Sequence, residues 1–255
     1  MSGPARLLVV RGGEAPGEDL AREEASLEAA ARGPAVLSWW SWPGPVVVLG
    51  YAQPATDADL GWCRARGIPV LRRVTGGTGI VHRRDLALSL ALPVAHPWAR
   101  SVRGLYDRFL TVLAAALGDV GVPARRPDPV PPRPVAERSP VCFLDRLADT
   151  LEVAGRKAVG CAQARRRDAV LVHALVALEP DPRLWAAALR TDAAAVAAGV
   201  GGVGAVSPDD LARAVAARLA AELGVCAEPA VLEPPPRALA RYGGDPRWSP
   251  LPPGR

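Results

Sequence analysis

The sequence predicts an α+β domain in which helices pack against a largely antiparallel or mixed sheet. Segments with the two-residue alternation of strands and segments with the 3.6-residue period of helices follow one another along the chain. Strand-like segments at 150–153 and 169–178 flank residues 155–163, which indicates an antiparallel meander. No internal repeat is visible, and 255 residues suffice for a substantial core without disulfides or a structural metal.

The first third of the chain carries clear start and stop signals. Acidic residues early in a helical pattern and Gly33 after it predict the first helix, and Pro43-Gly44-Pro45 predicts a turn between two strands. The elements expected here are a strand at 7–10, a helix at 18–32, strands at 35–39 and 46–49, a short helix at 55–66, a strand at 68–72 and a strand beginning at 80.

In the middle of the chain, leucine alternates with Ala or Ser over residues 86–92. This pattern predicts a strand with one bulky face and one small face, and the small face leaves room for a ligand. Apolar residues at helical spacing predict an amphipathic helix over 101–117. The Pro-dense segment 123–137 predicts a loop that leads to Cys142.

The last third is expected to begin with the meander, which places Lys157 in a hairpin turn. An Ala-rich segment predicts one helix at 186–198, and Ser207 followed by Pro predicts the N-cap of a last helix ending near Leu223. Beyond Glu233 the sequence is rich in Pro and Gly and lacks a period. We therefore expect one main domain over 1–230 and a poorly ordered tail over 231–255.

Composition bears on several classes of function. The net charge is +5, with acidic and basic residues interspersed, so no nucleic-acid partner is expected. No long apolar run or signal-peptide pattern is present, which argues against membrane spanning and secretion. The four cysteines form no CxxC pair, and the three histidines form no HExxH motif, so we expect a cytoplasmic protein without a metal site.

Two segments are rich in glycine. In RRVTGGTGIVH (72–82), the glycines let backbone N–H groups approach a carbonyl or phosphate, with Arg72 or Arg73 supplying charge, although a structural β-turn is an alternative. No lysine follows as in a P-loop. The segment GVGGVG (199–204) matches GxGxxG, but a helix precedes it where a dinucleotide site needs a strand, so it predicts a flexible loop.

Cys142 and Lys157 are the candidate reactive pair. Lys157 is the only lysine of the chain, whose other basic residues are all arginine. A nearby cation favours the thiolate, which attacks acyl carbonyls, so the pair predicts an acyl-enzyme nucleophile. The alternative is an inert cysteine and a solvated lysine.

Three motifs in order resemble the lipoate-protein ligase A and octanoyltransferase superfamily, which is related in fold to biotin protein ligases. They are VVLGYAQ (47–53), RRVTGGTGIVH (72–82), and GRKAVGCAQ (155–163) followed by His173. The resemblance extends from about Leu7 to Val225. It implies a catalytic domain of the biotin/lipoate protein ligase type.

Cys142-Phe143 lies 15 residues before the GRK lysine, as in the cysteine-dependent octanoyl-acyl carrier protein:protein N-octanoyltransferases. The resemblance implies that Cys142 receives an octanoyl or lipoyl group from acyl carrier protein as a thioester, that Lys157 lowers its pKa, and that no cofactor is needed. The acceptor is expected to be a lysine of a lipoyl domain, such as glycine-cleavage H protein. The substrate-binding residues implied are Arg73, Thr75, Gly76, Gly77, Thr78, Gly79, His82, Gly155 and Gly160.

Departures from the family pattern leave alternatives open. Thr78-Gly79 stands where transferases often have Arg-Ala, Arg83-Arg84 follows His82, and Ala174 replaces the usual Gly after His173. One alternative is an ATP-dependent lipoate-protein ligase that needs ATP and Mg and uses Lys157 to hold the acyl-adenylate. The other is a noncatalytic paralogue that binds lipoyl domains. His82 and His173 either line the site or pack in the core.

Overall fold

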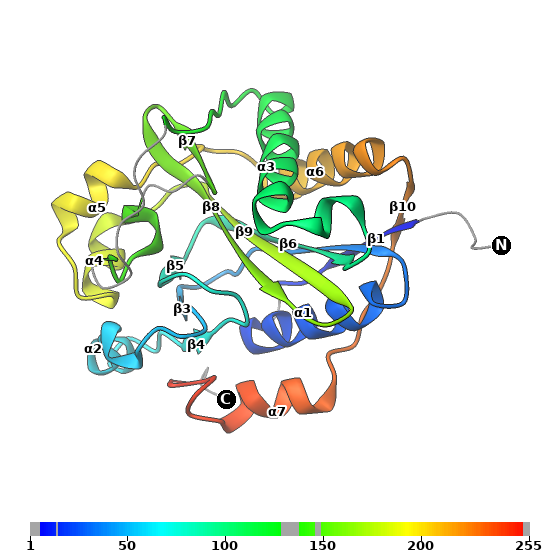
Figure 1. Cartoon of the computed structure of the whole chain (residues 1–255). Helices are drawn as coiled ribbons and strands as arrows, with labels where there is room; N and C mark the ends of the chain where they lie inside the picture. Colours follow the sequence, from blue (N-terminus) through cyan, green and yellow to red (C-terminus); the bar gives the residue numbers. More distant parts are fainter. Residues whose placement is uncertain (1–5, 14, 129–137, 146–148, 252–255) are drawn as a thin grey trace.

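A computed structural model describes residues 6–13, 15–128, 138–145 and 149–251. It confirms the α+β prediction: a seven-stranded mixed sheet runs through the molecule, and a three-stranded sheet lies beside it (Figure 1). Helices α3 and α6 cover one face of the large sheet, whereas α1 and the small sheet cover the other. The predicted loop at 123–137 is described only to residue 128, and that part forms neither helix nor strand apart from a bridge between Arg125 and Glu152.

The large sheet is antiparallel from β2 to its β7 edge, and β1 pairs in parallel with both β10 and β2. The central strands are buried along nearly their whole length, as expected for a sheet covered on both faces. In spatial order the strands are β10 (Cys226–Pro229), β1 (Arg6–Arg11), β2 (Ala35–Trp40), β6 (Asp85–Pro93), β9 (Ala169–Ala177), β8 (Arg156–Arg165) and β7 (Thr150–Val153).

The small sheet places β3 (Val46–Leu49) between β4 (Val70–Arg72) and β5 (Ile80–His82), so the glycine-rich segment connects its two outer strands. Among the helices, α6 starts at the predicted N-cap, where the Ser207 hydroxyl accepts from the Asp210 backbone N–H. The α-helices are α1 (Pro16–Ala30), α2 (Leu60–Arg64), α3 (Val102–Asp119), α4 (Pro182–Ala188), α5 (Ala193–Gly199), α6 (Pro208–Leu223) and α7 (Pro236–Gly244).

The two faces of β6 pack as the alternation predicts. Its leucines join the core cluster that contains Phe109 of α3 and Val215 of α6. On the small face, Ala91 packs with α1 residues, and Ala87 lies in the cluster that contains Trp40. The small residues at 87 and 91 therefore admit an indole ring and α1, and the expectation that this face also leaves room for a ligand stays a prediction.

Two local predictions are wrong. The predicted single helix at 186–198 is two helices, α4 and α5, because Asp192 caps the second by accepting from the Ala195 N–H at 2.7 Å, and Arg190 between them has a positive φ of 49°. Lys157 lies on β8 rather than in the hairpin turn. The turn is Ala154-Gly155, whose φ angles of 50° and 75° lie in the left-handed region.

The C-terminal segment is ordered through Leu251, so the prediction of a poorly ordered tail is wrong for residues 236–251. Helix α7 packs on α1 and buries Ala238 and Tyr242, which are four residues apart on one helix face. The Tyr242 hydroxyl donates to the Arg72 carbonyl at 3.0 Å, and the Arg72 N–H donates to the Trp248 carbonyl at 2.9 Å. The many prolines of this segment therefore do not prevent it from packing on the domain. The domain boundary at residue 230 stays a prediction.

Candidate functional site

The short 3-10 turn Cys142–Leu144 carries the candidate nucleophile. Cys142 is half-buried, and its backbone N–H donates to the Gly79 carbonyl at 2.8 Å. The Gly79 N–H donates in turn to the Pro140 carbonyl at 2.9 Å. A Cβ at residue 79 would lie 3.0 Å from that carbonyl oxygen and 2.8 Å from a methyl of Leu189, so glycine permits this close approach. The glycine-rich loop and the cysteine segment are thus held together by their backbones.

Lys157 holds the same turn from the sheet side. Its side chain is 2% exposed, and Nζ donates to the carbonyl oxygens of Cys142 at 2.8 Å and Asp145 at 2.9 Å. Nζ also lies 5.3 Å from the centroid of the Phe143 ring. An ammonium group has three N–H donors, so one remains for the sulfur or a substrate. The cation therefore fixes the backbone that positions the thiol.

Gly160 on β8 makes room for this arrangement. A Cβ there would lie 3.1 Å from Lys157 Cε and 3.2 Å from Phe143 Cε2. Both distances are shorter than an ordinary van der Waals contact. A larger residue at 160 would therefore displace the lysine or the aromatic ring.

Arg73 supports the glycine-rich loop from inside. Its buried guanidinium donates to the carbonyl oxygens of Gly76 at 2.7 Å and Thr78 at 2.9 Å. Burial lowers the pKa of Arg73, while the nearby Cys142 and Glu23 act to raise it. Gly77 has a φ of 85°, and a Cβ on it would lie 2.9 Å from Arg73 Nη2 and 3.9 Å from Cys142 Sγ. The loop thus passes directly over the sulfur.

One cavity is lined by Cys142, and a second lies near it. A void of about 10 Å³ lies at the thiol, among side chains of the sheet and the loop. A larger open pocket of about 530 Å³ includes Gly77 in its lining, and therefore reaches the neighbourhood of the sulfur. The larger pocket is lined by residues 51–54, 57, 74, 76–78, 138–139 and 163–166. The smaller one is lined by Arg73, Ile80, Cys142, Phe143, Gly160, Cys161, Ala162, His173 and Leu175.

Not every predicted site residue lies at these cavities. His82 is fully buried, with Nδ1 3.2 Å from an Asp85 carboxylate oxygen and its ring 4.5 Å from the Trp42 ring centroid. Gly155 is exposed in the β7–β8 turn, and Thr75 is buried with its carbonyl accepting from the Tyr51 N–H at 3.0 Å. None of the three lines either cavity. Their role in substrate binding stays a prediction.

Two polar side chains outside the predicted site residues, Gln53 and Glu23, also hold the site together. Gln53, the last residue of VVLGYAQ, donates to the Pro140 carbonyl at 3.0 Å and accepts from the Gly50 N–H at 3.2 Å, which fastens this loop to the cysteine segment. Glu23 of α1 binds His173, with 2.7 Å between its Oε1 and the histidine Nδ1. Its position three residues after Leu20 and four before Leu27 puts it on the buried helix face, which was an available signal.

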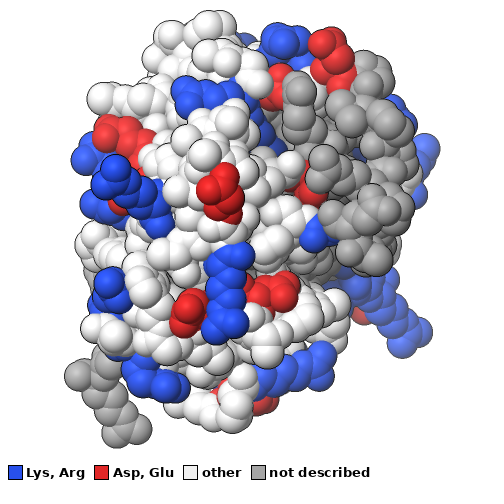
Figure 2. Space-filling view, turned by 90° about the vertical axis from the view of Figure 1, so that its left-hand side faces the viewer, with Lys and Arg blue, Asp and Glu red and all other residues white. Residues whose placement is uncertain are grey.

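No helix among the described residues is long and apolar enough to cross a membrane. Within the same ranges, no group of three or more His, Cys, Asp or Glu side chains is arranged to hold a metal ion. On the face shown in Figure 2, basic and acidic side chains are interspersed. Ion pairs in the described part of the chain include Arg83 with Asp181 at 2.7 Å and Arg84 with Glu179 at 2.6 Å.

Curated relatives share about a third of their residues with this chain over the matched region. Octanoyltransferase LipM of Carboxydothermus hydrogenoformans is 31% identical over 168 residues, covering 64% of this chain and 61% of the relative. The enzyme of the same name from Kyrpidia tusciae is 33% identical over 179 residues, covering 68% and 65%. The matches thus span somewhat less than two thirds of the length of these relatives.

Solved structures share the fold. A bi-partite lipoate protein ligase from Thermoplasma acidophilum superposes with a TM-score of 0.75 at 21% identity, covering 96% of this chain and 95% of that one. A lipoate-protein ligase A bound with ATP gives a TM-score of 0.74 at 22% identity, with 93% of each chain covered. The family model of the lipoyl protein ligase A/B catalytic domain matches residues 15–219. This match covers most of the chain, which therefore belongs to the lipoyl protein ligase A/B catalytic domain family.

Proposed function

We propose that this chain is a protein N-octanoyltransferase of protein lipoylation. It moves an octanoyl or lipoyl group from acyl carrier protein, through a thioester on Cys142, to a lysine of a lipoyl domain or glycine-cleavage H protein. The observation that carries the proposal is the pair of hydrogen bonds from the Lys157 ammonium to the Cys142 turn, together with the buried Arg73, which lines the void at the thiol. The relatives named octanoyltransferase support the reaction class.

In the first half-reaction the Cys142 thiolate attacks the thioester carbonyl of the donor. A bond forms between Sγ and the acyl carbon, the bond to the donor sulfur breaks, and the donor thiolate leaves and takes up a proton. Lys157 and Arg73 place two buried positive charges around this centre. They stabilise the negative charge that moves from sulfur to the carbonyl oxygen and back.

In the second half-reaction an acceptor lysine attacks the acyl carbon. The new amide bond forms, the bond to Cys142 Sγ breaks, and the thiol is restored. A thioester is already activated towards amines, so this route needs neither ATP nor Mg. The acceptor class is supported by the Thermoplasma acidophilum ligase, which was studied with its E2 lipoyl domain.

The test is intact-protein mass spectrometry after mixing the protein with octanoyl-acyl carrier protein in the absence of ATP. We expect one octanoyl adduct on the wild type and none on Cys142→Ala. Cys226→Ala is the matched control, because Cys226 is a free cysteine exposed on the edge strand β10. It should retain the adduct.

Other outcomes would redirect the proposal. If transfer to a lipoyl domain requires free octanoate or lipoate, ATP and Mg and survives Cys142→Ala, the chain is a ligase that uses Lys157 to hold an acyl-adenylate. If neither activity appears but a lipoyl domain binds, the chain is a noncatalytic paralogue.

A further inference from the structure

A buried carboxylate–imidazole pair lies beside the thiol and has no part in the mechanism above. Glu23 Oε1 on α1 lies 2.7 Å from His173 Nδ1 on β9, and the two side chains are 0% and 3% exposed. A hydrogen bond from Nδ1–H to a carboxylate fixes the imidazole tautomer and leaves Nε2 as an acceptor. This is the orienting relationship that general bases of acyl-transfer enzymes use.

His173 belongs to the lining of the void at Cys142. It pairs with Ala162 of β8 in the sheet register, and both residues line that void. Its Nε2 is buried and has no hydrogen-bond partner within the described part of the chain. An orphaned nitrogen at such a position costs free energy unless a substrate or a water satisfies it.

The surroundings restrict the imidazole further. The Trp40 ring lies edge-on to it, with ring centroids 5.5 Å apart. Arg73 supports the loop over the sulfur. Burial lowers its pKa, and the electrostatic interactions with Cys142 and Glu23 offset part of that effect. Cys142 and Glu23 thus each lie within electrostatic reach of Arg73, and Arg73, His173 and Cys142 line the same void.

We propose that His173 is a catalytic residue of the amine-transfer step, with Nε2 as the proton acceptor, and that Glu23 is its positioning residue. This inference rests on the proposed function and deepens it. The void is about the size of one water molecule, which suits the nitrogen of a lysine side chain better than a bulkier group. The void thus offers a small position that borders both Cys142, which would carry the acyl carbon, and an oriented base.

The step balances with the chain's own groups. The acceptor lysine loses one proton to solvent and attacks as the free amine. A C–N bond forms, one N–H proton moves to His173 Nε2, and the C–S bond to Cys142 breaks. The proton then passes from Nε2 to the departing sulfur, which restores the thiol and the neutral imidazole.

The experiment separates the two half-reactions. Octanoyl-enzyme is prepared from octanoyl-acyl carrier protein, and its transfer to a lipoyl domain is followed in a single turnover across a range of pH. For His173→Gln we expect thioester formation within about threefold of wild type, but transfer slower by about 100-fold or more, the usual contribution of a general base. Glu23→Gln should slow transfer by about tenfold. His96→Gln is the control, since His96 caps the 3-10 helix Pro97–Arg100.

The pH profile distinguishes a base from a packing residue. A pH dependence of the transfer rate that is present in the wild type and absent in His173→Gln marks the imidazole as the proton acceptor. The inference would be overturned if His173→Gln transferred the octanoyl group at the wild-type rate. It would also be overturned if the variant lost thioester formation and transfer to the same extent. If His173→Gln fails to fold, the decision falls on Glu23→Gln, whose unchanged transfer rate would count against it. Absence of any adduct on the wild type would instead remove the proposed function itself.

Discussion

The side-chain ammonium of Lys157 lies 2.8 Å from the backbone carbonyl oxygen of Cys142, and this contact ties the second residue of β8 to the turn that bears the thiol. The chain has one lysine, and that lysine is buried in this contact. Arginine carries the same charge but has a broad planar guanidinium, which does not fit where a compact ammonium meets two carbonyl oxygens.

We therefore predict that Lys157→Arg loses activity despite keeping the charge. Hydrogen bonds to a charged group are worth about 1.5–3 kcal/mol, so loss of one in the reacting state should slow thioester formation by about tenfold or more. The measurement is the rate of octanoyl adduct formation. Turnover close to wild type would show that only the charge of Lys157 matters.

Gly160 gives a test of the same contact from the neighbouring position. In Gly160→Ala the new methyl would lie 3.1 Å from Lys157 Cε, so the lysine or Phe143 must move, at a cost of about 1–3 kcal/mol. We expect a folded protein with slower adduct formation. Gly118→Ala in α3 is the matched control, since a Cβ there meets nothing within 4 Å. Equal rates in the two variants would argue against a tight fit at residue 160.

Cys142 and Lys157 show how much of the fold and of the site the sequence could predict. Local alternation and capping signals correctly predicted most strands and helices, because they depend on neighbours within a few residues. The motif spacing also brought Cys142 and Lys157 to one site. The sequence did not reveal that Lys157 binds backbone carbonyl oxygens. Every residue has such a carbonyl, so the residue type does not show which one accepts a hydrogen bond.

Long-range packing explains the remaining errors. The pairing of Glu23 with His173 joins residues 150 positions apart, and no local pattern records it. The high Pro and Gly content of the C-terminal segment predicts a disordered tail, because both residues are common in disordered chains. The order of the segment depends instead on a few anchors, such as Tyr242 and Trp248, that bind a distant strand.

The C-terminal anchors should be essential for stability. Trp248 is 8% exposed and packs against Tyr51 and Tyr242, with ring centroids 5.8 and 6.2 Å away. We predict that Trp248→Ala lowers the free energy of unfolding by about 3 kcal/mol, as is typical when a buried Trp is truncated. Val231→Ala should change it by less than about 0.5 kcal/mol, because Val231 is 83% exposed. Urea unfolding measures both. An unaffected Trp248→Ala protein would mean that the segment is not part of the cooperative fold.

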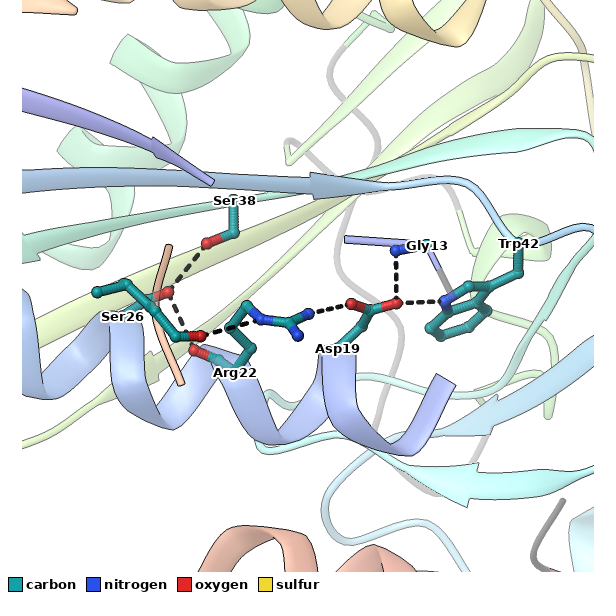
Figure 3. Close-up of polar contacts among 7 residues, drawn as sticks. Gly13, Asp19, Arg22, Ser26, Ser38 and Trp42 are labelled. Atoms are coloured by element: carbon teal, nitrogen blue, oxygen red, sulfur yellow. Dashed lines mark hydrogen bonds and ion pairs between the residues drawn. The ribbon is translucent and has the colours of Figure 1, made fainter. Parts of the chain in front are cut away.

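The buried carboxylate of Asp19 should make stability depend on pH. It accepts from the Gly13 N–H at 2.9 Å and from the Trp42 indole N–H at 2.8 Å, and it pairs with Arg22 (Figure 3). Burial raises the pKa of Asp19 above its ordinary value of 3.8, and these partners offset only part of that effect.

The pKa of Asp19 is higher in the folded protein than in the unfolded chain, so above pH 3.8 the folded protein binds more protons. The stability that Asp19 contributes is therefore lost as pH rises through the folded-state pKa. Asp119 has the opposite sign, since the hydrogen bond from Arg218 lowers its pKa and its contribution is lost as pH falls. We predict that Asp19→Asn removes a decline of unfolding free energy with rising pH, whereas Asp119→Asn removes a weaker decline with falling pH. Urea unfolding at closely spaced pH values checks both. A difference between wild type and Asp19→Asn that does not change with pH would contradict the burial argument, because a carboxyl with equal pKa in both states contributes no slope.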